Sequence, residues 1–215
     1  MAILGSMNIA IIGHGNIGGG LAKAWAAKGH ALVFGARDPE KSDLAALATS
    51  LGAKTATIRA AVEGAEVVVF AMPWGAVDDV IAAAGDLTGK IVIDCTNAVV
   101  RGKSGMALAY GHTNSSSEEL QRKIPGAKVF KSFNAQGAEN LANPTYGGVP
   151  ASNFFCGDDP EARAVVRRLV EDVGFQAVDV GPLENARLLE PLMLLWMASS
   201  RALGKRDLAF KLLER

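Results

Sequence analysis

A glycine-rich segment near the start of the chain carries the strongest chemical signal in the sequence. Gly13, Gly15 and Gly18 stand in Gly-x-Gly-x-x-Gly spacing, after the apolar residues 9–12 and before a helix-like segment at 21–28. A strand, a tight turn and a helix in this order present free backbone N–H groups and the positive end of the helix dipole to a phosphate. The segment therefore predicts a dinucleotide-binding turn; the alternative is a glycine-rich turn between a core strand and a helix.

Each glycine of this spacing has a physical role in such a turn. Gly13 permits the tight turn, Gly15 lets the backbone approach the pyrophosphate, and Gly18 lets the helix pack on the strand. His14 has two interpretations: its ring reaches the phosphates or the nicotinamide side of a dinucleotide, or it faces solvent as a turn histidine. We expect the whole segment to contact the cofactor: Gly13, His14, Gly15, Asn16, Ile17 and Gly18.

The end of the second expected strand indicates which dinucleotide binds. NAD-specific folds usually carry Asp or Glu there, to bind the ribose 2′-hydroxyl. This chain has Gly35 and Ala36 instead, followed by Arg37 and, four residues later, Lys41. An Arg can pair with a phosphate through two parallel N–H bonds, and a Lys adds a point charge. We therefore expect NADP(H) rather than NAD(H); the alternative is that Arg37 and Lys41 are ordinary solvated charges.

Composition excludes several other classes of function. The 22 Lys and Arg balance the 22 Asp and Glu, and no basic stripe stands out, so we expect no nucleic-acid partner. The most apolar run, residues 188–198, is broken by Glu190 and Pro191, so we expect no membrane span. Cys95 and Cys156 lie in apolar surroundings without metal-ligand spacing. They indicate buried reduced thiols in a cytoplasmic protein, and no metal site.

Strand-like and helix-like segments alternate along the chain. The strand-like apolar runs are unbroken, as in strands that are buried on both faces of a parallel sheet. We therefore expect an α/β fold of the Rossmann type, a doubly wound, mostly parallel sheet with a short C-terminal helical extension. The expected strands are residues 8–12, 31–34, 54–57, 67–71, 91–94, 128–131, 153–156 and 176–180. The expected helices are residues 18–28, 39–51, 75–84, 117–123 and 160–173, with a helix start at Asp38-Pro39-Glu40.

This order divides the chain into three parts. Residues 7–182 form the expected NADP-binding Rossmann domain. A Gly-Pro pair then separates it from residues 183–215, which we expect to be helical throughout. Residues 1–6 are expected to be an expression scar, because a Gly-Ser pair before Met7 looks like a cloning junction.

Three loops follow expected strands and should meet at one crevice. In open parallel sheets ligands bind outside the carboxyl ends of the strands, so residues 71–74, 96–98 and 133–136 belong at the same edge as the glycine turn. These loops hold no plausible proton-transfer triad, and we expect no catalytic side chain. Asp94 either points into the crevice or is a strand-end carboxylate. The long segment 101–117 is expected to be a lid or binding loop that ends in a serine-rich helix cap.

Several motifs together carry a family resemblance: residues 13–18, Gly35-Ala36-Arg37 with Lys41, residues 71–74, residues 156–160 and residues 179–190. On these motifs the chain resembles the F420H2:NADP oxidoreductases, in the wider group that includes the cytosolic reductase domain of six-transmembrane metalloreductases. The resemblance covers almost all of residues 7–213, and its last block is the most specific.

The resemblance implies roles for the motif residues. Arg37 and Lys41 would hold the 2′-phosphate, Met72, Pro73 and Trp74 would flank the nicotinamide half, and Asn97 and Ala135 would line the nicotinamide pocket. The loop residues expected to contact the cofactor are Ala71, Met72, Pro73, Trp74, Thr96, Asn97, Asn134 and Ala135. Such enzymes pass a hydride directly between two planar rings, so the protein has to position them and exclude water.

Three functions remain open from the sequence. The first is hydride transfer between NADP(H) and the deazaflavin coenzyme F420. The second is an NADPH-dependent reductase for a flavin, a ferric chelate or another small molecule, since residues 131–136 differ from archaeal members and look like bacterial relatives. The third is a dinucleotide-binding sensor without turnover. We also expect a homodimer, formed by an apolar stripe of Leu188, Leu192, Leu195 and Trp196 with a helix at 209–213.

Overall fold

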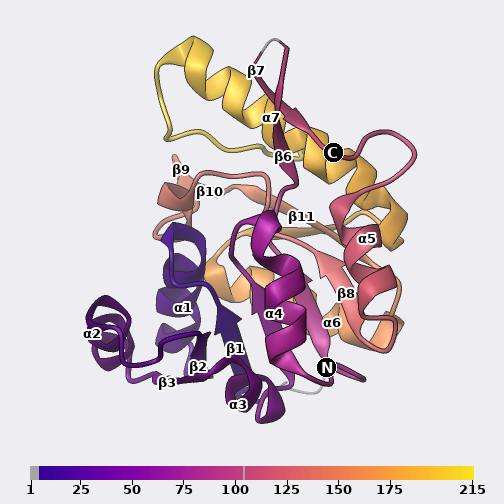
Figure 1. Cartoon of the computed structure of the whole chain (residues 1–215). Helices are drawn as coiled ribbons and strands as arrows, with labels where there is room; N and C mark the ends of the chain where they lie inside the picture. The colour runs from indigo at the N-terminus through magenta and orange to yellow at the C-terminus, as the bar shows by residue number, and fades with distance from the viewer. Residues whose placement is uncertain (1–4, 104) are drawn as a thin grey trace.

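The described part of the chain forms one eight-stranded sheet with helices on both of its faces (Figure 1). The computed structural model describes residues 5–103 and 105–215, so residues 1–4 of the expected scar lie outside the described residues. In sheet order the strands are β12 (Gln176–Asp179), β11 (Ser152–Gly157), β8 (Lys128–Lys131), β5 (Ile91–Asp94), β4 (Val67–Phe70), β1 (Asn8–Ile12), β2 (Ala31–Ala36) and β3 (Lys54–Thr57). Neighbouring strands pair in parallel except β8 and β11, which are antiparallel.

Helices cover the two faces in separate groups. The helices are α1 (Asn16–Ala27), α2 (Ser42–Leu51), α3 (Ile58–Glu63), α4 (Val77–Ala84), α5 (Ser116–Lys123), α6 (Pro160–Val173) and α7 (Ala186–Leu203). Side chains of α1, α2 and α6 pack with Ile9 and Ile11 on one face, and those of α3, α4 and α5 pack with Ala10 and Ile12 on the other. Because both faces are covered, residues 9–12 of β1 are all buried, which explains the unbroken apolar sequence of this part of the strand.

The eight expected strands are all present, with ends that differ by two residues at most. The five expected helices correspond to α1, α2, α4, α5 and α6. The expected helix start at residues 38–40 is wrong, since α2 begins at Ser42. Asp38 instead accepts a hydrogen bond from the backbone N–H of Glu40, 3.1 Å away, and so forms a local turn.

Some elements were not expected from the sequence. They are α3, the hairpin of β6 (Val99–Gly102) and β7 (Gly105–Leu108), a pair of two-residue strands, β9 (Thr145–Tyr146) and β10 (Val149–Pro150), and the 3-10 turn Ala138–Leu141. Two further 3-10 turns, Trp74–Ala76 and Leu183–Asn185, precede α4 and α7 and lie within or beside segments that were expected to be helical. The segment 101–117 is therefore part hairpin rather than a plain loop. Its expected helix cap is confirmed, because Ser115 Oγ accepts the backbone N–H of Glu118.

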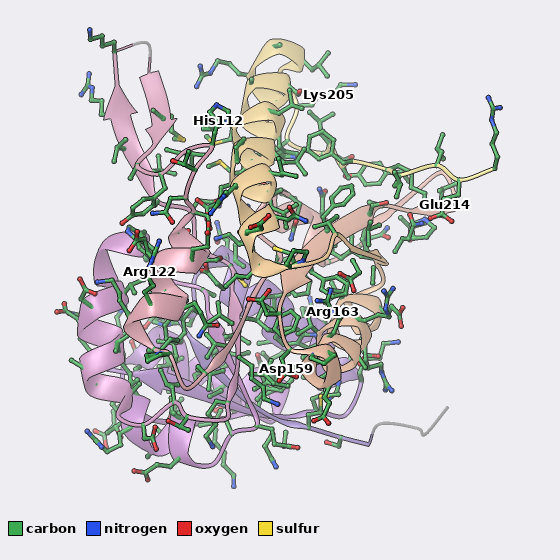
Figure 2. The ribbon with its side chains drawn as sticks, turned by 90° about the vertical axis from the view of Figure 1, so that its right-hand side faces the viewer. His112, Arg122, Asp159, Arg163, Lys205 and Glu214 are labelled. Atoms are coloured by element: carbon green, nitrogen blue, oxygen red, sulfur yellow. The ribbon has the colours of Figure 1, made fainter. Side chains whose placement is uncertain are left out.

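The C-terminal region is not helical throughout, and the expected helix at 209–213 is wrong. Helix α7 ends at Leu203 and is followed by the C-cap Gly204, whose φ of 62° is left-handed. The chain then runs back as an extended strap, from near Lys205 to Glu214 (Figure 2). The strap is held by the side chains of Trp196 and Asn140, which both donate to Leu208 O, at 2.7 Å each.

Two further observations concern the whole described chain. No helix among residues 5–103 and 105–215 is long and apolar enough to cross a membrane. Cys95 and Cys156 are free and buried, as expected. Burial raises the pKa of the Cys95 thiol well above its usual range and that of Cys156 to about 12. Both thiols therefore stay protonated and unreactive near neutral pH.

Candidate functional site

The glycine turn between β1 and α1 has the shape of a phosphate cradle. Gly13 has a φ of +106°, and a Cβ there would collide with the carbonyl oxygen of Ala71. A Cβ at Gly18 would collide with the carbonyl oxygen of Gly13, so these two glycines permit the turn and the close packing of α1. A Cβ at Gly15 would meet no atom within 4 Å. The open space at Gly15 is what a pyrophosphate needs in order to approach the backbone.

The start of α1 supplies the charge that such a cradle needs. Gly15 is the N-cap of α1, and in the described structure no side chain caps it and no acid lies in the first turn. The first backbone N–H groups of a helix have no partner within the helix, and they add to the positive end of its dipole. Residues Asn16, Ile17 and Gly18 therefore present donors to an anion at Gly15, and the turn fits a dinucleotide.

A charged group lies beside this turn, between β2 and α2. Arg37 is exposed after β2, and Lys41 is the N-cap of α2. Lys41 Nζ lies 3.1 Å from Asp43 Oδ2, and His14 Nε2 lies 3.5 Å from the same oxygen. The hydrogen bond from Lys41 is the main reason that the pKa of Asp43 is below its ordinary value. His14 therefore faces the loop that carries Arg37 and Lys41, and Asp43 is a member of the site that the sequence analysis missed.

The three expected crevice loops do meet at the carboxyl ends of the strands. Asn97, after β5, and Asn134, after β8, are joined by two hydrogen bonds: Asn134 Nδ2 donates to Asn97 Oδ1 at 3.1 Å, and Asn97 Nδ2 donates to Asn134 O at 3.0 Å. Ala71, Met72 and Trp74, after β4, are half-buried. The remaining expected contacts differ in burial: Pro73 is exposed, Ala135 is half-buried and Thr96 is buried.

Two observations suit this edge to a ligand. Thr96 Oγ1 and Gln136 Nε2 are buried without a hydrogen-bond partner among the described groups. Buried polar atoms are rarely left unpaired, so each of these two loops holds a hydrogen-bonding group that the described structure does not use. Phe133, which begins the loop after β8, is held at a φ of 58°, a strained value of the kind that clusters at functional sites. Tyr110 also reaches this edge, since its ring centroid lies 5.9 Å from that of Trp74.

Beneath this edge lies a buried ionic cluster that the sequence analysis did not foresee. Lys131, at the end of β8, has its Nζ 2.9 Å from Asp94 Oδ2 and 3.3 Å from Glu190 Oε1. All three side chains are at most 1% exposed. Burial by itself lowers the pKa of Lys131, but the attraction of Asp94 and Glu190 outweighs it and raises the pKa. Asp94 is therefore a partnered strand-end carboxylate rather than a group that points into the crevice.

The cluster joins four elements. Lys131 Nζ also donates to the carbonyl oxygen of Thr96 at 2.7 Å, which fixes the loop after β5. Glu190, on α7, accepts from the backbone N–H and the hydroxyl of Ser116 on α5, at 2.9 and 2.6 Å. Ser117 Oγ donates to Asp94 Oδ2 at 2.6 Å. Helix α7 is thereby held across the carboxyl ends of the central strands (Figure 1).

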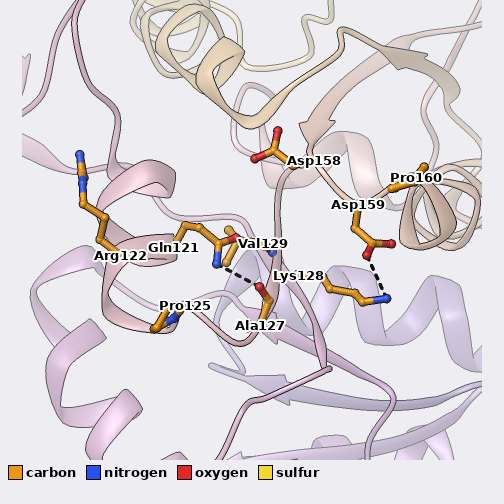
Figure 3. A pocket seen from close by; sticks show the side chains of 9 residues that line it. All are labelled: Gln121, Arg122, Pro125, Ala127, Lys128, Val129, Asp158, Asp159 and Pro160. Carbon is orange, nitrogen blue, oxygen red and sulfur yellow. Dashed lines mark hydrogen bonds and ion pairs between the residues drawn. The ribbon is translucent and has the colours of Figure 1, made fainter.

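A separate groove of about 580 Å³ lies between α5 and the start of α6 (Figure 3). Lys128 Nζ, at the amino end of β8, lies 3.0 Å from Asp159 Oδ2 inside this groove. The lining includes none of the residues expected to contact the cofactor. The groove is therefore separate from the expected cofactor contacts, which lie at the opposite ends of the parallel strands.

Comparison with known sequences gives consistent matches. Residues 8–98 match the family described as "NADP oxidoreductase coenzyme F420-dependent". F420-dependent NADP reductase from Methanothermobacter marburgensis is 32% identical over 200 residues, which cover 86% of this chain and 89% of that protein. Metalloreductase STEAP3 from Rattus norvegicus is 31% identical over 190 residues, 87% of this chain, but the match spans only 37% of the rat protein.

Comparison with solved structures agrees with the sequence matches. A protein from Arthrobacter sp. FB24, provisionally described as an F420-dependent NADP reductase, superposes with a TM-score of 0.89 and 31% identity over 97% of this chain and all of that one. A reductive aminase from Aspergillus terreus in complex with NADPH has a TM-score of 0.70 and 21% identity, over 92% of this chain and 63% of that one. The second likeness shows the fold alone.

The buried cluster predicts a large and specific loss of stability. Lys131→Met removes the cation and leaves two carboxylates buried, so we expect it to lower the free energy of unfolding by about 3–5 kcal/mol. Lys128→Met is the matched control, on the same strand, where the side chain is 33% exposed and pairs with Asp159; we expect a loss below about 1 kcal/mol. Urea unfolding followed by tryptophan fluorescence measures both. Equal small losses would contradict the role given to the cluster.

Proposed function

Because this chain belongs to the family of F420-dependent NADP oxidoreductases, we propose that it transfers a hydride between NADP(H) and the deazaflavin coenzyme F420. The observation that carries the proposal is one continuous edge, which joins an open phosphate turn, a group of cations and a set of fixed polar loops. The similarity to F420-dependent NADP reductases over most of both chains supports the second substrate.

The two halves of a dinucleotide would meet different residues at this edge. The backbone N–H groups at the start of α1 bind the pyrophosphate, and Arg37 and Lys41 bind the 2′-phosphate. Met72, Pro73 and Trp74 would flank the nicotinamide half, and the Asn97–Asn134 pair would line the same pocket. Ala71, Thr96 and Ala135 complete these loops.

The chemistry needs little from the side chains themselves. The nicotinamide supplies or accepts a hydride at its C4 carbon, and the balanced reaction is F420H2 + NADP+ ⇌ F420 + NADPH + H+. The carboxylate of Asp94 forms an ion pair with Lys131 and accepts a hydrogen bond from Ser117, so it is not free to act as a base. The loops therefore act by positioning two planar rings and by excluding water.

Stopped-flow oxidation of NADPH tests this function. We expect rapid oxidation with F420, much slower oxidation with FMN, FAD or ferric citrate, and weak activity when NADH replaces NADPH. The control is free F420 with NADPH in the absence of protein. Rapid turnover with flavin or ferric citrate alone would favour the small-molecule reductase. Tight NADPH binding without oxidation by any acceptor would indicate a sensor.

An exposed apolar surface near the same edge supports self-association. The stripe on α7 divides in the structure, because Trp196 is buried whereas Leu188 and Leu195 are 65% and 54% exposed. Val100 and Met106 of the adjoining hairpin are 44% and 46% exposed, and β7 contacts α7 (Figure 1). We propose that a second copy of the chain covers this surface, beside the crevice, in a cytoplasmic homodimer. Apolar interfaces of this kind are typical of permanent dimers.

Light scattering on the purified protein tests the dimer. We expect twice the monomer mass at micromolar concentration, and a shift to monomer in Leu195→Glu, because a charge in an apolar interface is costly. Leu213→Glu is the control, since Leu213 is 81% exposed on the C-terminal strap rather than on α7. A wild-type protein that is monomeric under these conditions would contradict the proposal.

A further inference from the structure

We propose that Asp43 and His14 set how strongly this protein prefers NADP(H) to NAD(H). Asp43 is a resident counter-ion that pairs with Lys41 and His14 and gives up both to an incoming 2′-phosphate. The inference rests on the proposed binding of NADP(H) and names two further residues that determine its specificity.

The geometry makes Asp43 the shared partner of two other side chains. Its Oδ2 lies 3.1 Å from Lys41 Nζ and 3.5 Å from His14 Nε2, while its Oδ1 accepts the backbone N–H of Leu44 at 3.0 Å. The side chains of Lys41, Asp43 and His14 are 57%, 56% and 29% exposed. Packing does not lock Lys41 and Asp43 in place, because both side chains are more than half exposed, so another anion can take the place of the carboxylate.

The charges around this point favour a phosphate over the carboxylate. Lys41, Arg37 and the N-terminal end of the ten-residue helix α2 supply positive charge, and the imidazole of His14 supplies a ring nitrogen that can donate a hydrogen bond to an anion. The loop itself carries two more carboxylates: Asp38 is tied to the backbone N–H of Glu40, and the side chain of Glu40 is exposed to solvent. A phosphate carries more charge and more acceptor oxygens than a carboxylate, so it competes well for the cations that Asp43 holds.

A ligand that lacks the 2′-phosphate does not compete with Asp43 for the cations. A ribose hydroxyl cannot displace a carboxylate from a cation, but it can donate a hydrogen bond to one, as in NAD-specific folds. Asp43 therefore weakens the binding of NADP(H) but does not oppose the binding of NAD(H). Removal of Asp43 should strengthen the preference for NADP(H) over NAD(H), whereas removal of His14 should weaken that preference.

Isothermal titration calorimetry with two small probes tests this without any turnover. The probes are adenosine 2′,5′-bisphosphate, which carries the 2′-phosphate, and 5′-AMP, which does not. We expect Asp43→Asn to bind the bisphosphate roughly three- to tenfold more tightly, because it frees Lys41 and His14. We expect His14→Gln to bind it more weakly by a similar factor. Neither variant should bind AMP more tightly.

A matched control separates this effect from a general change of charge. Asp78, in the first turn of α4, forms a similar pair with Lys123, whose Nζ lies 2.7 Å from Asp78 Oδ1. The variant Asp78→Asn removes this pair and makes the same change in net charge as Asp43→Asn. We expect it to bind both probes as the wild type does. In Lys41→Ala, the further change Asp43→Asn should give a smaller gain, because one of the two freed cations is missing.

The outcomes distinguish this inference from the function it rests on. If Asp43→Asn binds the bisphosphate no better than the wild type, or if Asp78→Asn gives the same gain, the role of Asp43 is wrong. If His14→Gln binds the bisphosphate as the wild type does, the role of His14 is wrong. If the wild type itself does not bind the bisphosphate more tightly than AMP, the proposed use of NADP(H) is wrong, whatever the variants show. Thermal melts of each variant show that the fold is intact.

Discussion

The ammonium group of Lys131 is buried, and much of the arrangement at the carboxyl edge depends on how it is paired. An isolated buried charge costs several kcal/mol, so Lys131 requires carboxylates that reach it from other elements. Asp94 comes from the neighbouring strand, and Glu190 comes from α7. The same ammonium group binds the carbonyl oxygen of Thr96. One charge thereby fixes where β5 and β8 end, how the loop after β5 turns, and where α7 crosses the sheet.

The edge above this cluster divides into two parts with different physical characters. The part near α2 is exposed and charged, with His14, Lys41 and Asp43 able to exchange partners. The part near α7 is fixed, because Asn134 donates to both Asn97 and Leu189 O, at 3.1 and 2.8 Å. An exposed, exchangeable group suits the choice between ligands, whereas a fixed and largely buried group suits the alignment of two reacting rings. The proposed function uses both parts of one binding site.

Local patterns in the sequence predicted most of the fold, and long-range pairs account for most of what was missed. The unbroken apolar runs placed the strands, and the glycine spacing placed the phosphate turn, because both signals lie within a few residues. The cluster was missed because Lys131 is 37 residues from Asp94 in the chain. A charge inside an apolar strand and Glu190 inside an apolar helix were the available signals. The C-terminal strap was missed because distant groups pair its carbonyl oxygens: the side chains of Asn140 and Trp196 donate to Leu208 O, and the backbone N–H of Ser152 donates to Phe210 O.

The most direct test of the account is the fate of a deuterium label at the nicotinamide. NADPH deuterated at C4, prepared separately in each of its two stereochemical forms, is oxidised by F420 in ordinary water, and the reduced F420 is analysed by mass spectrometry. Direct transfer predicts that one of the two forms delivers its deuterium to carbon C5 of the deazaflavin, where a C–H bond does not exchange with water. Loss of the label to solvent with both forms would contradict direct transfer at the edge formed by the glycine turn and the three loops.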